Sequence, residues 1–366
     1  MRLGVEAALI DGQLVPGDVE VRDDGTLGRH GLSSPNGRGI AAPGFVDLQV
    51  NGFGGVDLLE ADADGYRRAG EALLETGVTS YLPTFISAPE EQLVSALGAV
   101  PATAEGPRIL GVHLEGPFLA PNRLGTHPPE ARRDPDPALL ERLVAAGPVR
   151  LVTLAPELPG AEALVELLQD RGITVSCGHS NATAEEANAA FDRGVQTVTH
   201  LFNAMRPFRH RDPGIAGAAL ARDDVVVQII LDGVHLAPET VRVVWRAAAG
   251  RLALVTDAFA GAGTGIANGS YNLGGLEIAV RDGVARGPDG VLAGSTLTMI
   301  EAVRNLHALG VPLADALQAG SSVPAQVVGL SAIGRLEPGL PADVVVLDDN
   351  LEIDRVFVGG EARVVA

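Results

Sequence analysis

The chain has 366 residues, of which 46% are hydrophobic and 20% charged, as in an ordinary globular protein of about two domains. Acidic residues outnumber basic ones by 46 to 27, for a net charge of −19. This charge disfavours partners such as nucleic acid or an anionic membrane, because both need basic patches. Cys177 is the only cysteine, which excludes an intrachain disulfide and a cysteine-cluster metal site, and we expect a cytoplasmic protein.

Both ends of the chain alternate apolar and polar residues around Gly and Asp turns, as β-hairpins do. Near the start, Ala8-Leu9-Ile10 leads into an Asp11-Gly12 turn, and residues 18–25 repeat the pattern. The tail does the same over residues 342–347 and 356–360. We therefore predict a small β-sandwich domain built from both termini, residues 1–42 plus 337–366. The first residues lack the apolar core of a secretory signal.

Residues 43–336 alternate short strands with helical segments, which favours βα units and a parallel sheet. Eight such units over roughly 210 residues match a (β/α)8 TIM-like barrel, here the catalytic domain, with a doubly wound sheet as the alternative. The apolar runs stay far below the ~18 residues of a membrane span. Residues 261–270 are expected to form a flexible loop. The expected strands are 45–50, 79–83, 108–114, 149–154, 173–177, 197–199, 225–231 and 252–256, and the expected helices include 66–74, 90–100, 139–146, 161–171, 184–193 and 238–249.

Polar or ionisable side chains stand at or just after the carboxyl ends of many of these strands, which favours the barrel. A barrel gathers its active site from the ends of different strands, whereas an open sheet concentrates it at one switch point. The residues in question are Gln49, Asn51, His113, Glu115, His179, His200, His235 and Asp257.

Three of these residues, Glu115, His179 and His200, make a His2Glu set of the kind that holds a catalytic zinc with an open position. Each histidine by itself has the alternative interpretation of an ordinary buried or surface residue. Several of them at the rim of one barrel favour the metal site.

Asp257 follows an apolar strand, so it is either a helix N-cap or turn residue, or a general base beside an activated water. With a metal across the rim we favour the base. Gln49 and Asn51 stand where many metal hydrolases on this barrel carry His-x-His for a second metal, and amides are poor zinc ligands. The sequence also contains no lysine that could bridge two metals. We therefore predict one divalent metal ion, with Gln49 and Asn51 as structural or hydrogen-bonding groups.

In combination, these segments resemble the N-acetylglucosamine-6-phosphate deacetylases of the amidohydrolase superfamily, and the resemblance covers nearly the whole chain. The single motifs are shared across the superfamily, whereas their combination with FNAM (202–205) is specific. The segments are PGFVDLQVNGFGG (43–55), HLEGPF (113–118), GHSNA (178–182), THLFNAM (199–205), RDPG (211–214), DGVH (232–235), VTDA (255–258), LAGS (292–295) and GLPAD (339–343).

The resemblance implies a role for each matching position. Glu115, His179 and His200 bind the metal, Asp257 moves a proton from the activated water to the departing amine, and His127 polarises the acetyl carbonyl. The sugar phosphate is held by Asn203, Ala204, Arg211 and His235, with Arg211 acting across a dimer interface, and the sugar pocket is lined by Thr126, Leu292, Ala293 and Gly294.

The function that follows is hydrolysis of N-acetyl-D-glucosamine 6-phosphate to D-glucosamine 6-phosphate and acetate by a cytoplasmic homodimer or dimer-based oligomer. Zinc is the expected metal, with Fe²⁺, Co²⁺ and Mn²⁺ as alternatives. The alternative substrates are N-acetylgalactosamine 6-phosphate and N-acylated amino acids, and the phosphate-binding residues argue against unphosphorylated compounds. A non-catalytic scaffold is disfavoured, because no metal ligand is lost and Asp257 is present.

Overall fold

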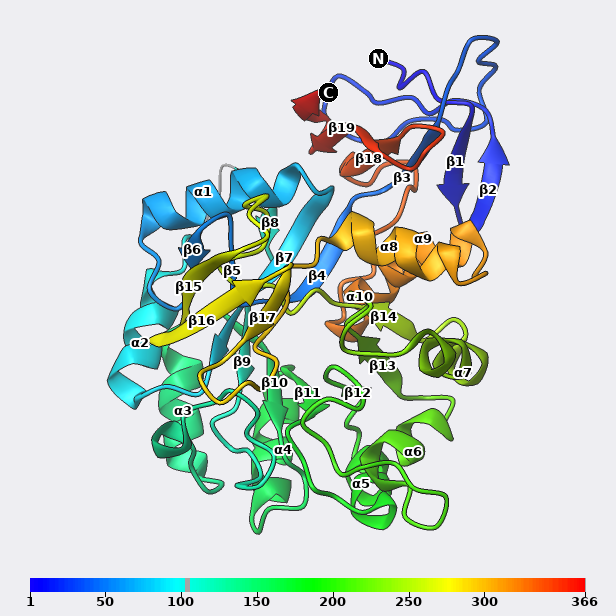
Figure 1. Ribbon diagram of the computed structural model, residues 1–366. Helices are drawn as coiled ribbons and strands as arrows, with labels where there is room; N and C mark the ends of the chain where they lie inside the picture. Colours follow the sequence, from blue (N-terminus) through cyan, green and yellow to red (C-terminus); the bar gives the residue numbers. More distant parts are fainter. Residues whose placement is uncertain (103–105, 366) are drawn as a thin grey trace.

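The computed structural model describes residues 1–102 and 106–365. Its centre is a barrel of parallel strands, as predicted, and the strand order β4-β7-β9-β10-β11-β12-β13-β14 follows the chain (Figure 1). The ring closes between its first and last strands, where Val50 and Ala258 form a parallel bridge and the Asn51 N–H donates to the Ala258 carbonyl at 2.7 Å. The strands are β4 (Phe45–Val50), β7 (Val78–Ile86), β9 (Val112–Glu115), β10 (Val149–Leu154), β11 (Thr174–Cys177), β12 (Thr197–Val198), β13 (Val226–Ile229) and β14 (Leu252–Leu254).

All eight strands overlap the predicted ones, and β4 and β10 match them residue for residue. The predicted strand 108–114 is divided into β8 (Arg108–Ile109) and β9, because Gly111, at φ +130°, interrupts the extended backbone between them. These strands are buried on both faces, which explains why they read as continuous apolar runs.

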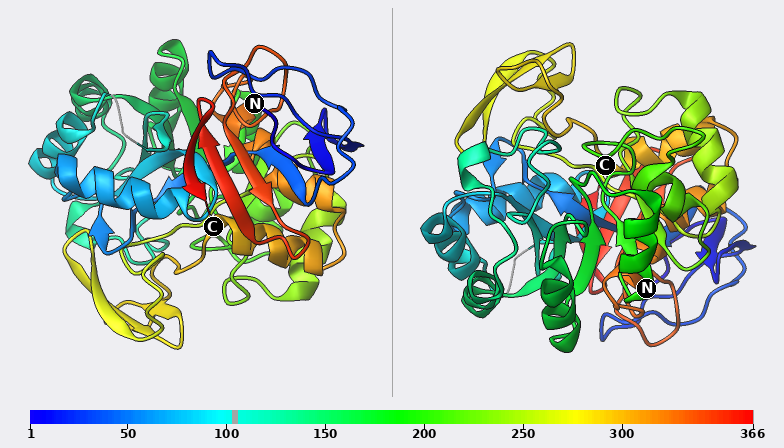
Figure 2. Two further views of the ribbon diagram at one scale, coloured as in Figure 1. Left: turned by 90° about the horizontal axis from the view of Figure 1, so that it is seen from above. Right: turned by 90° about the horizontal axis from the view of Figure 1, so that it is seen from below.

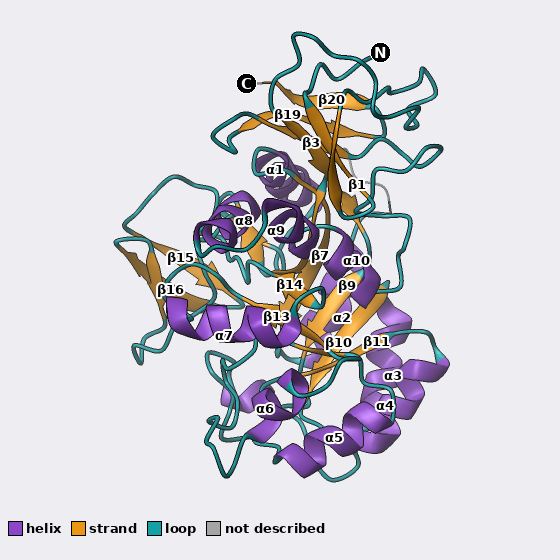
Figure 3. Ribbon diagram, turned by 90° about the vertical axis from the view of Figure 1, so that its right-hand side faces the viewer, coloured by secondary structure: helices purple, strands orange, loops and turns teal. Residues whose placement is uncertain are grey.

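A helix follows each barrel strand and covers the outside of the ring (Figure 3). In α5 (Ala184–Asp192), for example, Thr183 and Glu186 form a capping box, and the buried residues Ala187, Ala190 and Phe191 recur at helical spacing. The others are α1 (Ala63–Leu74), α2 (Glu90–Ala99), α3 (Pro137–Ala146), α4 (Ala161–Asp170), α6 (Gly214–Leu220), α7 (Pro238–Ala248) and α8 (Met299–Ala308), with α9 (Leu313–Ala319), α10 (Ser322–Val327) and a 3-10 turn, Pro129–Ala131, in addition. None of the described helices is long and apolar enough to cross a membrane.

The two chain ends build one six-stranded sheet beside the barrel, as predicted (Figures 1 and 2). Asp11 and Gly12, both with positive φ, turn β1 into β2. Residues 18–25 form isolated bridges to residues 2, 27 and 32 and no continuous strand, while Val19 and Val21 pack in one buried cluster with residues of the sheet. The second layer of the predicted sandwich is therefore irregular. The exact division at residues 42/43 and 336/337 stays a prediction, since β3 spans residue 42. The sheet order is β2 (Gln13–Pro16), β1 (Ala7–Ile10), β3 (Ile40–Pro43), β18 (Val344–Leu347), β19 (Ile353–Val358) and β20 (Glu361–Val365).

A third sheet, which the sequence analysis missed, is inserted between β14 and α8 and extends from the barrel (Figure 2). It consists of β15 (Gly269–Leu273), β16 (Leu276–Arg281) and β17 (Val284–Arg286). The predicted end of the loop 261–270 is wrong, because strand β15 already starts at Gly269. The alternation of Leu276, Ile278 and Val280 with polar or small residues is a strand signal that could have revealed this sheet. A short hairpin of β5 (Gly52–Phe53) and β6 (Val56–Asp57) lies on the way from β4 to α1.

Arg251 joins two of the outer helices. Its buried guanidinium donates to the carbonyls of Ala219 (3.2 Å) and Leu220 (2.9 Å) at the end of α6, and to Ala247 (2.9 Å) at the end of α7. A further bond reaches the Val225 carbonyl at 2.7 Å. A cation at two helix C-termini is favourable, because it faces carbonyl groups that lack partners within the helix.

We expect Arg251→Met to lower the free energy of unfolding by about 2–4 kcal/mol, since it leaves several buried carbonyls without a donor. Urea unfolding followed by circular dichroism measures this change. The matched control is Arg242→Met, which alters an exposed arginine of α7 and should stay within about 0.5 kcal/mol of the wild type. Equal losses in the two variants would contradict the assigned role.

Candidate active site

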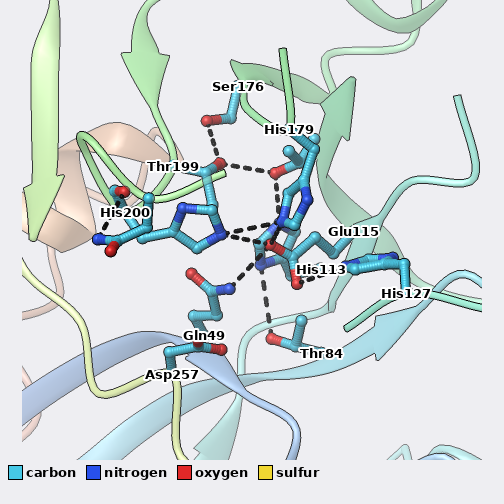
Figure 4. Close-up of polar contacts among 12 residues, drawn as sticks. Gln49, Thr84, His113, Glu115, His127, Ser176, His179, Thr199, His200 and Asp257 are labelled. Atoms are coloured by element: carbon cyan, nitrogen blue, oxygen red, sulfur yellow. Dashed lines mark hydrogen bonds and ion pairs between the residues drawn. The ribbon is translucent and has the colours of Figure 1, made fainter. Parts of the chain in front are cut away.

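Three side chains at the carboxyl end of the barrel converge on one point (Figure 4). Glu115 is the last residue of β9, and His179 and His200 each come two residues after the end of β11 and β12. The Glu115 Oε1 atom lies 3.1 Å from His179 Nε2 and 2.9 Å from His200 Nε2, and the two nitrogen atoms are 3.1 Å apart. All three residues are buried. The barrel thus brings together the predicted His2Glu set.

The hydrogen-bond partner of His179 indicates which of its ring nitrogen atoms carries the hydrogen. Its Nδ1 lies 2.9 Å from the carbonyl oxygen of Arg123, so Nδ1 carries the hydrogen in the neutral ring. Its Nε2 then directs a lone pair at a carboxylate oxygen and at a second imidazole nitrogen. A hydrogen on His200 Nε2 or a metal ion among these three atoms relieves the repulsion between their lone pairs. The donor set therefore fits a divalent metal ion, which takes imidazole and carboxylate ligands together.

The charge on Glu115 agrees with this interpretation. Burial alone would raise the pKa of Glu115, but the imidazoles of His127, His179 and His200 that face its oxygens hold that pKa well below its usual range. Glu115 is therefore a carboxylate at neutral pH.

Gln49 and Asn51 act as hydrogen-bond donors to the site's carboxylates. The Gln49 Nε2 donates to Glu115 Oε1 at 3.0 Å, and the Asn51 Nδ2 donates to Asp257 Oδ1 at 2.8 Å. Both amides therefore have hydrogen-bonding roles at these two positions. Within residues 1–102 and 106–365, the residues suited to holding a metal form the single cluster around Glu115.

His127 lies beside this cluster with its tautomer set by a backbone group. The Ser87 N–H donates to His127 Nδ1 at 3.2 Å, so the neutral ring carries its hydrogen on Nε2. That Nε2 is 3.6 Å from Glu115 Oε2. Burial lowers the pKa of His127 to about 4, and the ring is therefore a neutral donor at pH 7. It can polarise a carbonyl group without carrying a charge.

Asp257 stands across the cavity from His127, just after β14. Burial and the nearby Glu115 carboxylate raise the pKa of Asp257 to about 6. Asn51 occupies Oδ1, and among the described residues no donor faces Oδ2, so Oδ2 is the oxygen available for proton transfer. A carboxyl group with a pKa near neutrality suits a residue that first accepts a proton and then returns it.

The backbone is strained at the residues that carry this chemistry. His179, His200 and Asp257 have φ values of 47°, 28° and 50°, in the left-handed region that non-glycine residues rarely adopt. Each lies immediately beyond a barrel strand, where the sharp turn aims the side chain over the mouth of the barrel. Strain of this kind accumulates at functional sites.

A chain of buried hydrogen bonds lies under the cluster and was missed in the sequence. His113 Nε2 lies 2.7 Å from Thr153 Oγ1, which lies 2.7 Å from Thr199 Oγ1, and Ser176 Oγ is 2.6 Å from Thr199 Oγ1 (Figure 4). His113 Nδ1 faces the Leu48 carbonyl at 3.1 Å. These bonds connect the strands that end in Glu115, His179 and His200. The signal was a small hydroxyl residue near the end of each of β10, β11 and β12.

A cavity of about 280 Å³ opens above the cluster. Its wall includes most of the residues predicted to bind the sugar phosphate. One of them, His235, is held in place by Asp232, because the Asp232 Oδ2 atom lies 2.7 Å from His235 Nδ1. Two predicted residues are not on the wall: Ala293 is buried behind it, and Arg211 is exposed on the loop between β12 and α6. The predicted residues that line the cavity are Glu115, Thr126, His127, His179, His200, Asn203, Ala204, His235, Asp257, Leu292 and Gly294, and those that sequence reasoning did not assign to it include Ile86, Ile230, Leu273 and Val291.

Comparison with known proteins assigns the chain to a family. The model of the Amidohydrolase family matches residues 40–363. The chain is 40% identical over 341 residues to human N-acetylglucosamine-6-phosphate deacetylase, covering 88% of this chain and 83% of that protein. It is 36% identical over 330 residues to N-acetylgalactosamine-6-phosphate deacetylase of Escherichia coli O157:H7, covering 88% and 87%.

Solved structures agree with these relatives. The N-acetylglucosamine-6-phosphate deacetylase of Thermotoga maritima has a TM-score of 0.91 at 33% identity, with 100% of each chain covered. An aspartate-to-alanine variant of the Mycobacterium smegmatis enzyme, in complex with N-acetyl-D-glucosamine 6-phosphate, has a TM-score of 0.92 at 37% identity, with 98% of each chain covered.

The chain therefore belongs to the amidohydrolase family. Its relatives within that family are N-acetylglucosamine-6-phosphate deacetylases and an N-acetylgalactosamine-6-phosphate deacetylase. Both the resemblance seen in the sequence and the barrel fold are confirmed.

We expect His200→Ala to lose most of its bound metal on dialysis, because two protein ligands remain of three. Metal analysis of the purified protein by mass spectrometry measures the content per chain. His210→Ala, which removes an exposed histidine from the same loop region, is the control and should keep the wild-type content. Unchanged metal in His200→Ala would place the site elsewhere.

Proposed function

We propose that this chain hydrolyses the acetamide of N-acetyl-D-glucosamine 6-phosphate to D-glucosamine 6-phosphate and acetate. The observation that carries the proposal is the placement of a His2Glu cluster, a neutral His127 and Asp257 on the wall of one cavity. Amide hydrolysis needs an activated water, a donor for the developing oxyanion and a proton for the amine, and this set can supply all three. The names of the relatives support the substrate.

Glu115, His179 and His200 would hold one divalent cation. Such an ion, when bound, polarises the amide carbonyl and lowers the pKa of water from 15.7 to roughly 7. Zinc is the ion that this donor set favours, and Fe²⁺, Co²⁺ or Mn²⁺ can take the same ligands.

Two residues of the chain would stabilise the developing charge and transfer the proton. His127 donates its Nε2 hydrogen to the acyl oxygen as negative charge develops there, an effect worth about 3–4 kcal/mol for a single donor. Asp257 accepts a proton from the attacking water at Oδ2 and delivers it to the nitrogen of the departing amine. Asn51 keeps the Asp257 carboxylate oriented by its bond to Oδ1.

The phosphate end of the substrate would lie over the loops that follow β12 and β13. Asn203, Ala204 and His235 line the cavity there. On the other walls, Thr126, Leu292 and Gly294 would contact the sugar, with Ala293 supporting them from behind.

Arg211 would complete the phosphate site of a second copy of the chain, because it is exposed and does not line its own cavity. An apolar groove beside that cavity supports a homodimer, or a larger oligomer built from dimers. Phe208 and Val243, 52% and 58% exposed, line this groove together with His235, which also lines the catalytic cavity. Arginine suits this role, since its planar guanidinium group matches the geometry of phosphate oxygens.

We place the protein in the cytoplasm, as its metabolic relatives and single buried cysteine suggest.

A second candidate substrate is N-acetylgalactosamine 6-phosphate, the C4 epimer, because a relative at 36% identity is named for it. The reacting amide and the phosphate are the same in both compounds, so the same residues would serve.

The first experiment is acetate release from N-acetylglucosamine 6-phosphate, with its unphosphorylated form and the C4 epimer alongside and metal content measured on the same sample. We expect release from the phosphorylated sugar and little from the free sugar. Arg211→Ala should weaken the phosphorylated substrate selectively, whereas Arg209→Ala, an exposed neighbour, is its control. No release from either epimer by metal-replete protein would overturn the proposal.

Asp257→Asn should keep the metal but lower turnover by about 10²- to 10⁴-fold, because the amide cannot accept the proton. For the wild type, kcat/KM should fall as the pH drops below about 6, since protonation of Asp257, whose pKa burial raises to about 6, removes the base. Rate profiles from pH 5 to 9 measure this acid limb. Near-normal turnover in the variant would exclude proton transfer by Asp257.

A further inference from the structure

The wall of the catalytic cavity includes two aliphatic side chains that the proposed mechanism does not use, Ile86 and Leu273. Ile86 is the last residue of β7 and pairs directly with Glu115 of β9. The next residue, Ser87, contacts His127 Nδ1 through both its N–H (3.2 Å) and its Oγ (3.0 Å). Ile86 therefore lies next to both a metal-site residue and the residue that would polarise the acyl carbonyl.

Leu273 reaches the cavity from outside the barrel, at the tip of the β15–β16 hairpin. It packs in one buried cluster with Ile86 and Phe259. The following residue, Gly274, has φ +57°, and a Cβ there would come within 2.8 Å of the Ile86 Cδ1 atom, so the hairpin turn rests closely on Ile86. The inserted sheet thus places one side chain against the barrel's own wall.

Asp57 fixes this hairpin tip in place. Its Oδ2 accepts hydrogen bonds from the Gly274 N–H at 2.7 Å and from Asn272 Nδ2 at 3.2 Å, while its Oδ1 accepts from the Leu59 N–H at 3.0 Å. The tip is consequently held by the β5–β6 region of the barrel as well as by apolar packing, which makes the Leu273 side chain a firm boundary.

The position of this boundary relative to the substrate follows from the barrel order. Ile86 is on β7, the second strand of the ring, whereas Asn203, Ala204 and His235 follow β12 and β13, the sixth and seventh strands, on the far side. In the pyranose ring, C2, which carries the acylated nitrogen, stands opposite C5, which carries the phosphorylated C6. With the phosphate over β12 and β13, the acyl methyl group would lie on the β7 side of the cavity, toward Ile86 and Leu273.

We propose that Ile86 and Leu273 form an acyl wall that determines the length of the acyl group this enzyme removes, accepting acetyl and rejecting longer chains. This inference rests on the proposed deacetylase function and names the residues that set its acyl specificity. The reason is steric: a further methylene on the acyl group would enter the volume of two buried side chains whose backbones are fixed.

The test compares kcat/KM for the N-acetyl, N-propionyl and N-butyryl derivatives of glucosamine 6-phosphate, using metal-replete wild type and variants. We expect the wild type to prefer acetyl, and Leu273→Ala to narrow the acetyl-to-propionyl ratio by about tenfold or more, which is the range that one methylene in an apolar pocket controls. Leu273→Val, a smaller change that disturbs folding less, should shift the ratio in the same direction.

The matched control is Leu276→Ala. Leu276 pairs with Leu273 across the same hairpin and packs on the same cluster, but it does not line the cavity. It should therefore keep the wild-type ratio, so a general loosening of the hairpin is separated from loss of the wall.

Two results would overturn the acyl wall while leaving the deacetylase function intact: a wild type that cleaves all three derivatives equally, or an unchanged acyl ratio in Leu273→Ala and Leu273→Val. Absence of acetate release by the wild type is different, because it overturns the proposed function itself. An equal shift in Leu276→Ala would also overturn the assignment to Leu273.

Discussion

The site depends on one electrostatic constraint, the buried Glu115 carboxylate that faces the Nε2 atoms of His179 and His200. A buried charge is costly unless it is compensated. Here the imidazoles of His127, His179 and His200 face the carboxylate, and the same cluster would hold a divalent metal ion. The Arg123 carbonyl fixes the tautomer of His179, so the ligand nitrogen stays free of hydrogen. The cluster is therefore built for a metal before any metal binds.

The barrel meets this constraint with a polar layer directly below the ligands. His113, Thr153, Thr199 and Ser176 connect neighbouring strands through buried hydrogen bonds. Thr199 directly precedes His200, and Thr153 is paired with Glu115. The hydrogen-bond chain therefore restrains the strand ends from which the ligands project, and rigid strand ends are what precise ligand geometry requires.

The same site shows how a common scaffold acquires a particular reaction. The metal cluster and Asp257 come from strand ends, which the barrel provides in any member of the fold. Much of the cavity wall comes from the connecting segments, among them the β12–α6 loop and the β15–β17 insertion. The two contributions meet at the proposed acyl wall, because Ile86 ends a barrel strand and Leu273 belongs to the insertion.

The sequence by itself determined the barrel and predicted the three residues that cluster at its mouth. Strands such as β4 and β10 are continuous buried runs, and local pattern suffices to locate them. Glu115, His179, His200 and Asp257 could be named because each follows such a run. Only the tertiary structure decided the rest. The bonds from Gln49 to Glu115 and from Asn51 to Asp257 join residues 66 and 206 positions apart, and Leu273 reaches Ile86 from a separate sheet. Such contacts depend on how strands and loops are arranged in space, and a local sequence pattern does not specify which distant residues come into contact.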